Sequence, residues 1–311
     1  MKKIFLYGAG KRGKKVAEIL MDKGIEISGF LDSNKIGEVI IGEHRYQIFS
    51  PESIVYDKDK FQVIISIAEY SIAQEIKSKM NGIEIVTVED VLSKHLGNII
   101  ENNRDYIAEY HNHVMEDYYR GAESEESIEK FWNEKSEFFK LFSLLDLSNV
   151  IELACGHGRH VKQYIDKANH ITLVDILEKN IAFCKERFIG EKKIDYYMNN
   201  GHDLKELDSN MYSALFTYDA MVHFEMMDVF EYLRETERVL QPGGMALFHH
   251  SNNTEDYRIT FSTGTFGRNY MSAQLFAYLA NRAGLDIKDQ CLINWNGVDN
   301  LDCLTLVEKL G

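Results

Sequence analysis

The 311-residue sequence has little cysteine, little proline and no long apolar run. Its four cysteines, Cys155, Cys184, Cys291 and Cys303, lie far apart and form no C-x-x-C pair, which argues against a disulfide frame or a zinc site. No apolar stretch approaches the roughly 20 residues of a membrane span. The N-terminus has neither the length nor the cleavage site of a signal peptide. We therefore expect free thiols, a cytoplasmic location and no membrane partner.

The sequence also lacks an excess of basic residues. It has 49 acidic and 35 basic residues, which gives a formal net charge of −14. A general nucleic-acid binder needs a basic face for phosphate contacts, so we expect no nucleic-acid partner. A local basic cluster around Lys11, Arg12, Lys14 and Lys15 suits a phosphate-bearing small molecule. We expect a small-molecule partner, and a homodimer stays open.

Three regions of the chain differ in pattern. Residues 1–96 and 149–311 alternate short apolar runs with amphipathic segments, whereas residues 97–148 are helical in pattern and rich in aromatic residues. Alternating strands and helices predict parallel sheets with right-handed crossovers. The expected fold class is α/β: a small Rossmann-like nucleotide-binding domain (1–96), a helical linker or cap (97–148), and a seven-stranded Rossmann-like domain (149–311). Strands are expected at 4–7, 25–31, 63–67, 83–88, 150–154, 170–175, 194–198, 214–219, 244–250, 285–293 and 302–308.

The first region opens on a glycine-rich phosphate-binding pattern. The run Gly8-Ala-Gly-Lys-Arg-Gly13 has the form G-x-G-x-x-G between an expected strand and helix, and an acid follows about 20 residues on. This region resembles the small N-terminal domains of bacterial sugar acyltransferases, which implies a nucleotide or nucleotide-sugar ligand. NAD(P) and an assembly role stay open, because about 90 residues make only half of a dinucleotide fold. The candidate nucleotide-binding residues are Gly8, Gly10, Lys11, Arg12, Gly13 and Asp32.

The third region opens on a different glycine-rich turn. The run Val150-Ile-Glu-Leu-Ala-Cys-Gly-His-Gly-Arg-His160 ends a strand in a turn, and the next expected strand closes on Asp175. Small residues let a nucleoside approach the backbone, and a carboxylate can accept both ribose hydroxyls. Together with Asn200-Gly-His-Asp-Leu204 and Arg238-Val-Leu-Gln-Pro-Gly-Gly244, this region resembles the class I S-adenosylmethionine-dependent methyltransferases.

The resemblance implies S-adenosylmethionine as cofactor and assigns roles to particular residues. Glu152 is expected near the methionine amino group, and Gly156 and Gly158 where the backbone passes close to the cofactor. Asp175 is expected to bind the ribose hydroxyls, with Ile176 packed on the adenine. The other candidate cofactor contacts are Ala154, Gly201, His202, Asp203 and Tyr218 near the strand ends, and Tyr118, Tyr119 and Trp132 from the aromatic helices.

Histidines gather where a base for methyl transfer to an alcohol is expected. A sulfonium methyl is already electrophilic, so an enzyme mainly aligns the reactants and removes the proton of the acceptor. Neighbouring strand residues face opposite ways, so His249 and His250 should not both point into the site. We select His250 as the base, with Asp219 or His223 as its orienting partner. No carboxylate spacing demands a metal ion, and none is expected.

The two resemblances together imply a methyltransferase that modifies an oxygen of a small hydroxylated acceptor, such as a sugar or nucleotide-sugar in glycan biosynthesis. Two alternatives stay open. The first is an NAD(P)-dependent oxidoreductase or nucleotide-sensing protein that uses the N-terminal glycine-rich motif. The second is a protein or RNA methyltransferase, against which the acidic composition counts.

Overall fold

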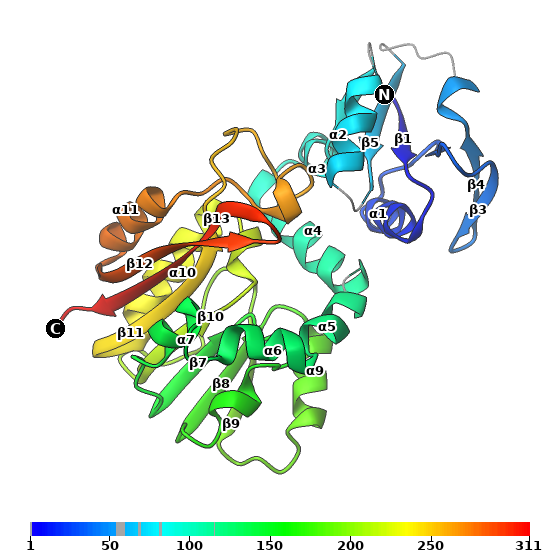
Figure 1. The fold of residues 1–311 in the computed structure, drawn as a ribbon. Coiled ribbons are helices and arrows are strands. Elements are labelled where there is room, and N and C mark those ends of the chain that lie inside the picture. The colour runs from blue at the N-terminus through cyan, green and yellow to red at the C-terminus, as the bar shows by residue number, and fades with distance from the viewer. Residues whose placement is uncertain (1, 54–59, 68–69, 81–82, 115) are drawn as a thin grey trace. The chain divides into compact units, whose positions relative to one another are not determined.

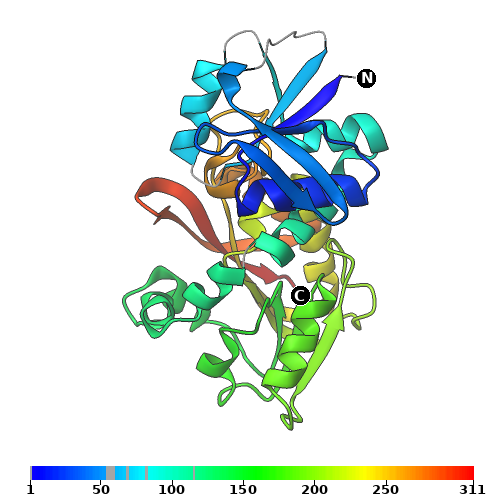
Figure 2. The same cartoon turned by 90° about the vertical axis from the view of Figure 1, so that its right-hand side faces the viewer.

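The computed structural model describes residues 2–53, 60–67, 70–80, 83–114 and 116–311; the side chains of residues 70, 71, 112–114 and 116–118 lie outside the description. Contacts divide the chain into two compact units, residues 1–115 and 116–311. They run from blue to blue-green and from green to red in Figures 1 and 2. This division falls within the stretch 97–148 that the sequence marks as helical. None of the helices in the described ranges is long and apolar enough to cross a membrane.

The first unit contains a six-stranded sheet in the order β3-β4-β2-β1-β5-β6. Its strands are β1 (Lys3–Tyr7), β2 (Gly29–Leu31), β3 (Gly37–Ile41), β4 (His44–Phe49), β5 (Phe61–Ile65) and β6 (Glu84–Val86). All neighbours are parallel except the pair β3 and β4. This antiparallel hairpin is absent from our sequence prediction. Its signal is the two-residue turn at Gly42 and Glu43, in which Gly42 has a φ of +55°.

Helices of the first unit follow the expected alternation. They are α1 (Lys11–Asp22), α2 (Tyr70–Lys79), α3 (Val88–Leu96) and α4 (Ile99–Val114), with a 3-10 turn at Pro51–Ser53. In α1 the buried Val16, Ile19 and Leu20 recur at helical spacing and pack the helix on the sheet. Helix α3 begins in a capping box, because Thr87 and Asp90 bind each other's backbone N–H.

The second unit contains a seven-stranded sheet in the order β12-β13-β11-β10-β7-β8-β9. Its strands are β7 (Asn149–Leu153), β8 (His170–Asp175), β9 (Ile194–Met198), β10 (Tyr212–Thr217), β11 (Leu240–Ser251), β12 (Leu285–Trp295) and β13 (Val298–Lys309). Strand β13 is antiparallel to both of its neighbours, and the other pairs are parallel. The α/β fold class predicted from the sequence is confirmed for both units.

Helices cover both faces of the second sheet (Figure 1). They are α5 (Glu116–Ala122), α6 (Glu125–Trp132), α7 (Glu137–Phe142), α8 (Val161–Tyr164), α9 (Glu178–Arg187), α10 (Met226–Val239) and α11 (Ala273–Ala283), with 3-10 turns at Met221–His223 and Thr265–Gly267. Residues of α7, α8 and α9 pack on one face of the sheet, with Val150 and Leu247. Those of α10 and α11 pack on the other, with Ile151 and Phe248. Successive residues of a strand therefore point to opposite faces of the sheet.

Candidate active site

Three acidic side chains lie at the carboxyl ends of neighbouring strands in the second unit. Glu152 lies in β7, Asp175 ends β8, and Asp219 follows β10 by two residues. Strand β7 pairs with both β8 and β10, so the three positions share one edge of the sheet. Ligands of open α/β sheets bind at this edge, where the strand order reverses.

Glu152 is a buried carboxyl group with an unused oxygen. Its side chain belongs to a residue that is 2% exposed, and Oε2 accepts a hydrogen bond of 2.7 Å from the Tyr164 hydroxyl. Oε1 has no hydrogen-bond partner among the described residues. Burial raises the pKa of Glu152 to about 8, against the opposing effects of the Tyr164 hydrogen bond and the Arg159 charge. A buried carboxylate with an open lone pair fits a cationic ligand group such as an ammonium.

Asp175, at the end of β8, is hydrogen-bonded to the glycine-rich turn. Its Oδ2 accepts the Gly156 N–H at 2.8 Å, and Oδ1 accepts the Leu177 N–H at 2.9 Å and the Asn180 amide at 3.1 Å. Burial raises the pKa of Asp175, and these donors counteract part of that rise. Ile176, the next residue, is half-buried beside it.

The space beside Gly156 is occupied by Tyr119. A Cβ at Gly156 would lie 3.0 Å from the Cε1 atom of Tyr119. The Tyr119 ring stacks on His157 at 4.4 Å, and its hydroxyl bonds to Asn180, the neighbour of Asp175. Tyr119 therefore lies at the predicted ribose-binding carboxylate. The side chain of Tyr118 lies outside the described residues.

Gly158 is closely packed on the side where a side chain would lie. A Cβ at this position would lie 2.7 Å from the Phe188 ring and 3.3 Å from the Cys184 sulfur. Gly158, with a φ of +68°, thus allows close packing inside the protein. Ala154 has a φ of +56°, which is uncommon for a residue with a side chain and occurs often at functional turns.

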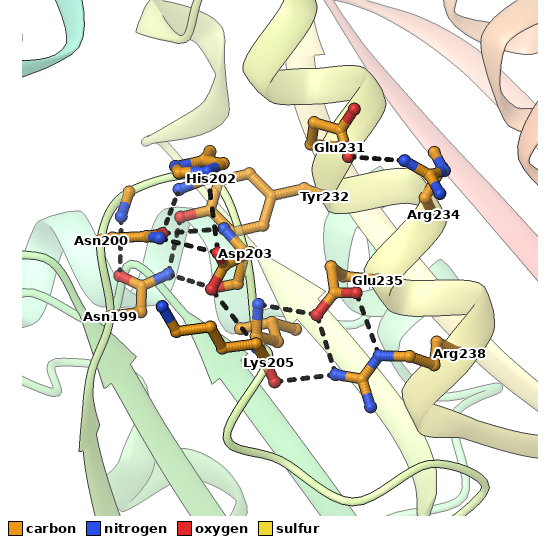
Figure 3. Close-up of polar contacts among 12 residues, drawn as sticks. Asn199, Asn200, His202, Asp203, Lys205, Glu231, Tyr232, Arg234, Glu235 and Arg238 are labelled. Atoms are coloured by element: carbon orange, nitrogen blue, oxygen red, sulfur yellow. Dashed lines mark hydrogen bonds and ion pairs between the residues drawn. The ribbon is translucent and has the colours of Figure 1, made fainter. Parts of the chain in front are cut away.

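The loop after β9 is held in one shape by its own polar groups (Figure 3). Asn200 accepts the backbone N–H groups of His202 and Asp203 and donates its amide to the Asp203 carboxylate. Asn199 accepts the Gly201 N–H, and its amide donates to the Tyr232 hydroxyl in α10. His202 Nδ1 is buried without a hydrogen-bond partner in the described structure.

Helix α10 anchors the end of this loop (Figure 3). Glu235 accepts the Leu204 N–H at 2.9 Å, and Arg238 donates to the Leu204 and Leu207 carbonyls and pairs with Glu235. The residues Gly201, His202 and Asp203 therefore lie in a rigid loop that follows β9, next to β8 and Asp175 in the sheet.

Asp219 lies in a strained backbone conformation at the end of β10. Its φ is +59°, and its carboxylate, 3% exposed, pairs with Arg159 at 3.1 Å. Arg159 belongs to the glycine-rich turn region, so this ion pair joins the ends of β7 and β10. Tyr218 is buried beside it, with ring contacts to Phe131 at 4.9 Å and to His249 at 4.6 Å.

The assignment of His250 as the base is wrong, because the strand turns this side chain to the other face. His250 stacks on Phe276 of α11 at 3.8 Å, and its ring nitrogens bond to the Ser251 carbonyl and the Thr305 hydroxyl. Burial lowers the pKa of His250 to about 3, so it is a poor proton acceptor near neutral pH. His249 instead faces the Tyr218 side.

His223 lies in the 3-10 turn after β10. Its Nδ1 is 3.0 Å from the Gly267 carbonyl, which can only accept, so Nδ1 carries a proton. The ring lies edge-on to Phe261 at 5.5 Å, and the Asn269 amide donates a hydrogen bond to the His223 carbonyl.

The assignment of Trp132 to the cofactor site is also corrected. Its indole N–H donates to His160 Nδ1 at 3.0 Å, and its ring contacts Phe142 at 4.7 Å and Phe138 at 5.3 Å. Trp132 thereby packs α6 on the core of the second unit. An aromatic residue at helical spacing more often has this role.

The glycine-rich turn of the first unit packs helix α1 closely on strand β1. A Cβ at Gly13 would lie 1.8 Å from the Gly8 carbonyl oxygen, so glycine is required there for helix α1 to approach β1. A Cβ at Gly10 would meet nothing within 4 Å, which leaves this position open. Asp32 accepts the Ala9 N–H at 2.9 Å.

Two basic residues of that turn differ in surroundings. The Arg12 guanidinium lies 4.9 Å from the centre of the Tyr110 ring, and its Nε is buried without a hydrogen-bond partner in the described part of the chain. Lys11 is exposed at the start of α1.

From the sequence we expected no role for Arg159 and no pairing of Arg268 with Asp302. Arg159 is the single charged residue in the glycine-rich turn, and this position could have marked it as a site residue from the sequence. Asp302 and Arg268 meet only after the chain has folded, so their pairing has no local signal. Within the described residues, no group of three or more His, Cys, Asp or Glu side chains could hold a metal ion.

The strand order of the second unit and the acidic residues at its strand ends are those expected of an α/β domain of the class I methyltransferase type. Residues 151–248 match the model of a family described as a methyltransferase domain, and residues 3–80 match that of the PglD N-terminal domain. The second unit therefore holds a methyltransferase domain, which implies S-adenosylmethionine as donor. The first unit holds a PglD-type domain of the sugar acyltransferase kind. The resemblances given under Sequence analysis are confirmed.

Individual relatives are distant. The methyltransferase-named protein YqeM of Bacillus subtilis (strain 168) is 23% identical over 107 residues, which are 34% of this chain and 43% of the relative. The chain thus spans less than half the length of this curated relative. An S-adenosylmethionine-dependent methyltransferase from Mesorhizobium loti is 15% identical, with 56% of this chain and 97% of that one covered and a TM-score of 0.47. The PH0226 protein from Pyrococcus horikoshii OT3 is 18% identical, with 62% and 99% covered and a TM-score of 0.46.

Proposed function

We propose that this protein transfers a methyl group from S-adenosylmethionine to an oxygen of a small hydroxylated acceptor, such as a sugar or nucleotide-sugar in glycan biosynthesis. The observation that carries the proposal is the row of three carboxyl groups, Glu152, Asp175 and Asp219, at one edge of the second sheet. The family match of the surrounding residues supports a methyl-donor site at that edge.

The residues present fit the donor. Glu152 Oε1, buried and without a partner among the described residues, would receive the amino group of the methionine part. Asp175 already accepts three N–H groups, which leaves one of its four acceptor positions for a ribose hydroxyl. Ile176 and the fixed loop at Gly201, His202 and Asp203 would contact the adenine. When bound, the donor supplies an electrophilic methyl group, so the chain need only orient the acceptor, exclude water and remove a proton.

His223 is the residue that supports methyl transfer to oxygen. An alcohol must lose its proton, and histidine is the side chain that most often accepts a proton in catalysis. The Gly267 carbonyl orients the His223 ring through Nδ1. The Tyr218 and Asp219 side chains belong to the same segment after β10 and would face the acceptor.

The choice of a sugar-type acceptor rests on the first unit. Its PglD-type match and the open position at Gly10 support a nucleotide or nucleotide-sugar ligand. Gly8, Gly10, Gly13 and Asp32 would form that site, with Lys11 or Arg12 near phosphate.

Two experiments test the proposal. Thermal-shift screening of the full chain with S-adenosylhomocysteine and a set of nucleotide-sugars should show stabilisation by both ligand types. Radiolabelled methyl transfer to the stabilising sugar should then fall by about 100-fold or more in His223→Asn. Asparagine can keep the hydrogen bond to Gly267 but has no group at the Nε2 position. Transfer at the wild-type rate would exclude His223 as the base, and absence of donor binding would refute the enzyme assignment.

A further inference from the structure

Both ring nitrogens of His249 form hydrogen bonds, and the two partners together determine the tautomer of the ring. Nδ1 lies 3.0 Å from the backbone nitrogen of Asp219, and an amide N–H can only donate. Nδ1 therefore carries the lone pair and Nε2 the proton, which is donated to Asp302 Oδ2 at 3.1 Å. The side chain is fully buried. A neutral ring with both nitrogens bonded has no position left for a proton from a substrate.

Asp302 is held as an anion on the far side of His249. Arg268 binds it with two hydrogen bonds, from Nε to Oδ1 at 3.0 Å and from a terminal nitrogen to Oδ2 at 2.7 Å. Burial alone would raise the pKa of Asp302, but the His249 and Arg268 hydrogen bonds lower it to about 2. The Arg268 guanidinium also lies 4.9 Å from the centre of the Trp295 ring. The acceptor of the Nε2 proton is thus fixed in place.

Asp219 is hydrogen-bonded to the other nitrogen of the His249 ring, and its backbone conformation needs this support. A residue with a side chain at a φ of +59° is in a backbone conformation that is intrinsically unfavourable and needs support from its surroundings. Its N–H is the group that His249 accepts, and its carboxylate is the group that Arg159 pairs with. The backbone bond and the ion pair together set the direction in which the carboxylate points.

We propose that His249 is a positioning residue, supported by Asp302 and Arg268, that holds Asp219 so that its carboxylate faces the transferring methyl group. This inference rests on the proposed function, because that function assigns the end of β10 to the methyl group. The role of His249 is therefore not that of a base on β11 but that of a structural support for the acidic residue that follows β10.

Sinefungin tests the inference without a known acceptor, because it carries an ammonium group where S-adenosylmethionine carries its methyl group. The wild-type full chain should bind sinefungin at least about tenfold more tightly than S-adenosylhomocysteine, because a carboxylate faces that ammonium. The measured quantity is the ratio of the two dissociation constants by isothermal titration. Asp219→Asn should remove the preference.

Two isosteric variants separate the bonds of His249. In His249→Asn the side-chain oxygen can reach the Nδ1 position and keep the Asp219 bond. In His249→Gln the amide reaches the Nε2 position and keeps only the Asp302 bond. The ratio should stay within about threefold of wild type in the first and fall about tenfold in the second. His250→Gln, on the same strand but the opposite face, is the matched control and should keep the ratio.

Equal ratios in the two His249 variants, whether both retained or both lost, would overturn the positioning role. A second measurement covers the case in which a variant does not fold. Nitrogen-15 NMR of labelled wild-type protein should show His249 with a bare Nδ1 and a protonated Nε2, and the opposite tautomer or a doubly protonated ring would overturn the inference. If neither ligand binds the wild type, the proposed function fails, while the NMR result still decides the geometry of His249.

Discussion

Glu152 provides the most quantitative prediction, because the structure places a carboxyl group in a site that disfavours its charge. The residue is 2% exposed, and burial raises its pKa from the ordinary value of 4.5 to about 8. Substitution by glutamine, Glu152→Gln, keeps the size and the acceptor for the Tyr164 hydroxyl but removes the titration.

The sign of the effect follows from linkage. The pKa of Glu152 is higher in the folded protein than in the unfolded chain, so between about pH 4.5 and 8 the folded protein binds more protons. The free energy of unfolding therefore falls as pH rises through this range. A shift of this size corresponds to a loss of up to about 5 kcal/mol of unfolding free energy, at 1.36 kcal/mol per pKa unit. We expect the wild type to lose this stability from pH 5 to pH 8.5, and Glu152→Gln not to lose it.

Urea denaturation followed by tryptophan fluorescence measures this directly, because both tryptophans, Trp132 and Trp295, belong to the second unit. Other titrating groups are common to both proteins, so the difference between their pH profiles isolates Glu152. The new amide N–H₂ of glutamine shifts the variant's stability by a constant of about 1–3 kcal/mol, without changing the slope. Parallel profiles of the two proteins would refute the assigned environment of Glu152.

Three further substitutions test other parts of the second unit. Gly158→Ala should destabilise it by about 2–4 kcal/mol in the same urea assay, because the new methyl group meets Phe188 at 2.7 Å and the φ is positive; a loss below about 0.5 kcal/mol would contradict this packing. Trp132→Phe should cost about 1–3 kcal/mol by leaving Nδ1 of His160 without its donor, yet keep the affinity for S-adenosylhomocysteine within about threefold; a large affinity loss would return Trp132 to the donor site. His250→Gln should keep methyl-donor affinity in titration calorimetry, and its loss would show that the face of β11 is misassigned.

Local sequence patterns predicted the sheets well, because strand and helix periodicities are set by neighbouring residues. The sequence prediction lacks the hairpin of β3 and β4, because an antiparallel hairpin at the edge of a sheet does not follow the alternation of strands and helices on which the prediction was based. The glycine-rich turns and the strand-ending acids Glu152 and Asp175 were located correctly along the chain, because their spacing is short-range.

The long-range side-chain partners could not be predicted in the same way. The face of His250 depends on the register of β11, and a shift of one residue exchanges the two histidines. The pairing of Asp302 with Arg268 joins positions 34 residues apart through tertiary structure. The close packing of Phe188 against Gly158 is likewise a tertiary contact, and the sequence alone does not show it.

Isothermal titration of the full chain with S-adenosylhomocysteine tests the central claim, that the carboxylate edge at β7 and β8 binds a nucleoside donor. We predict saturable binding at one site, weakened at least about 30-fold by Asp175→Ala and unchanged by Asp195→Asn, an exposed acid on the same sheet. Thermal denaturation shows whether each variant is folded, because Asp175 also holds the Gly156 N–H. Absence of binding by the wild type, or equal affinity in a folded Asp175→Ala protein, would contradict the account.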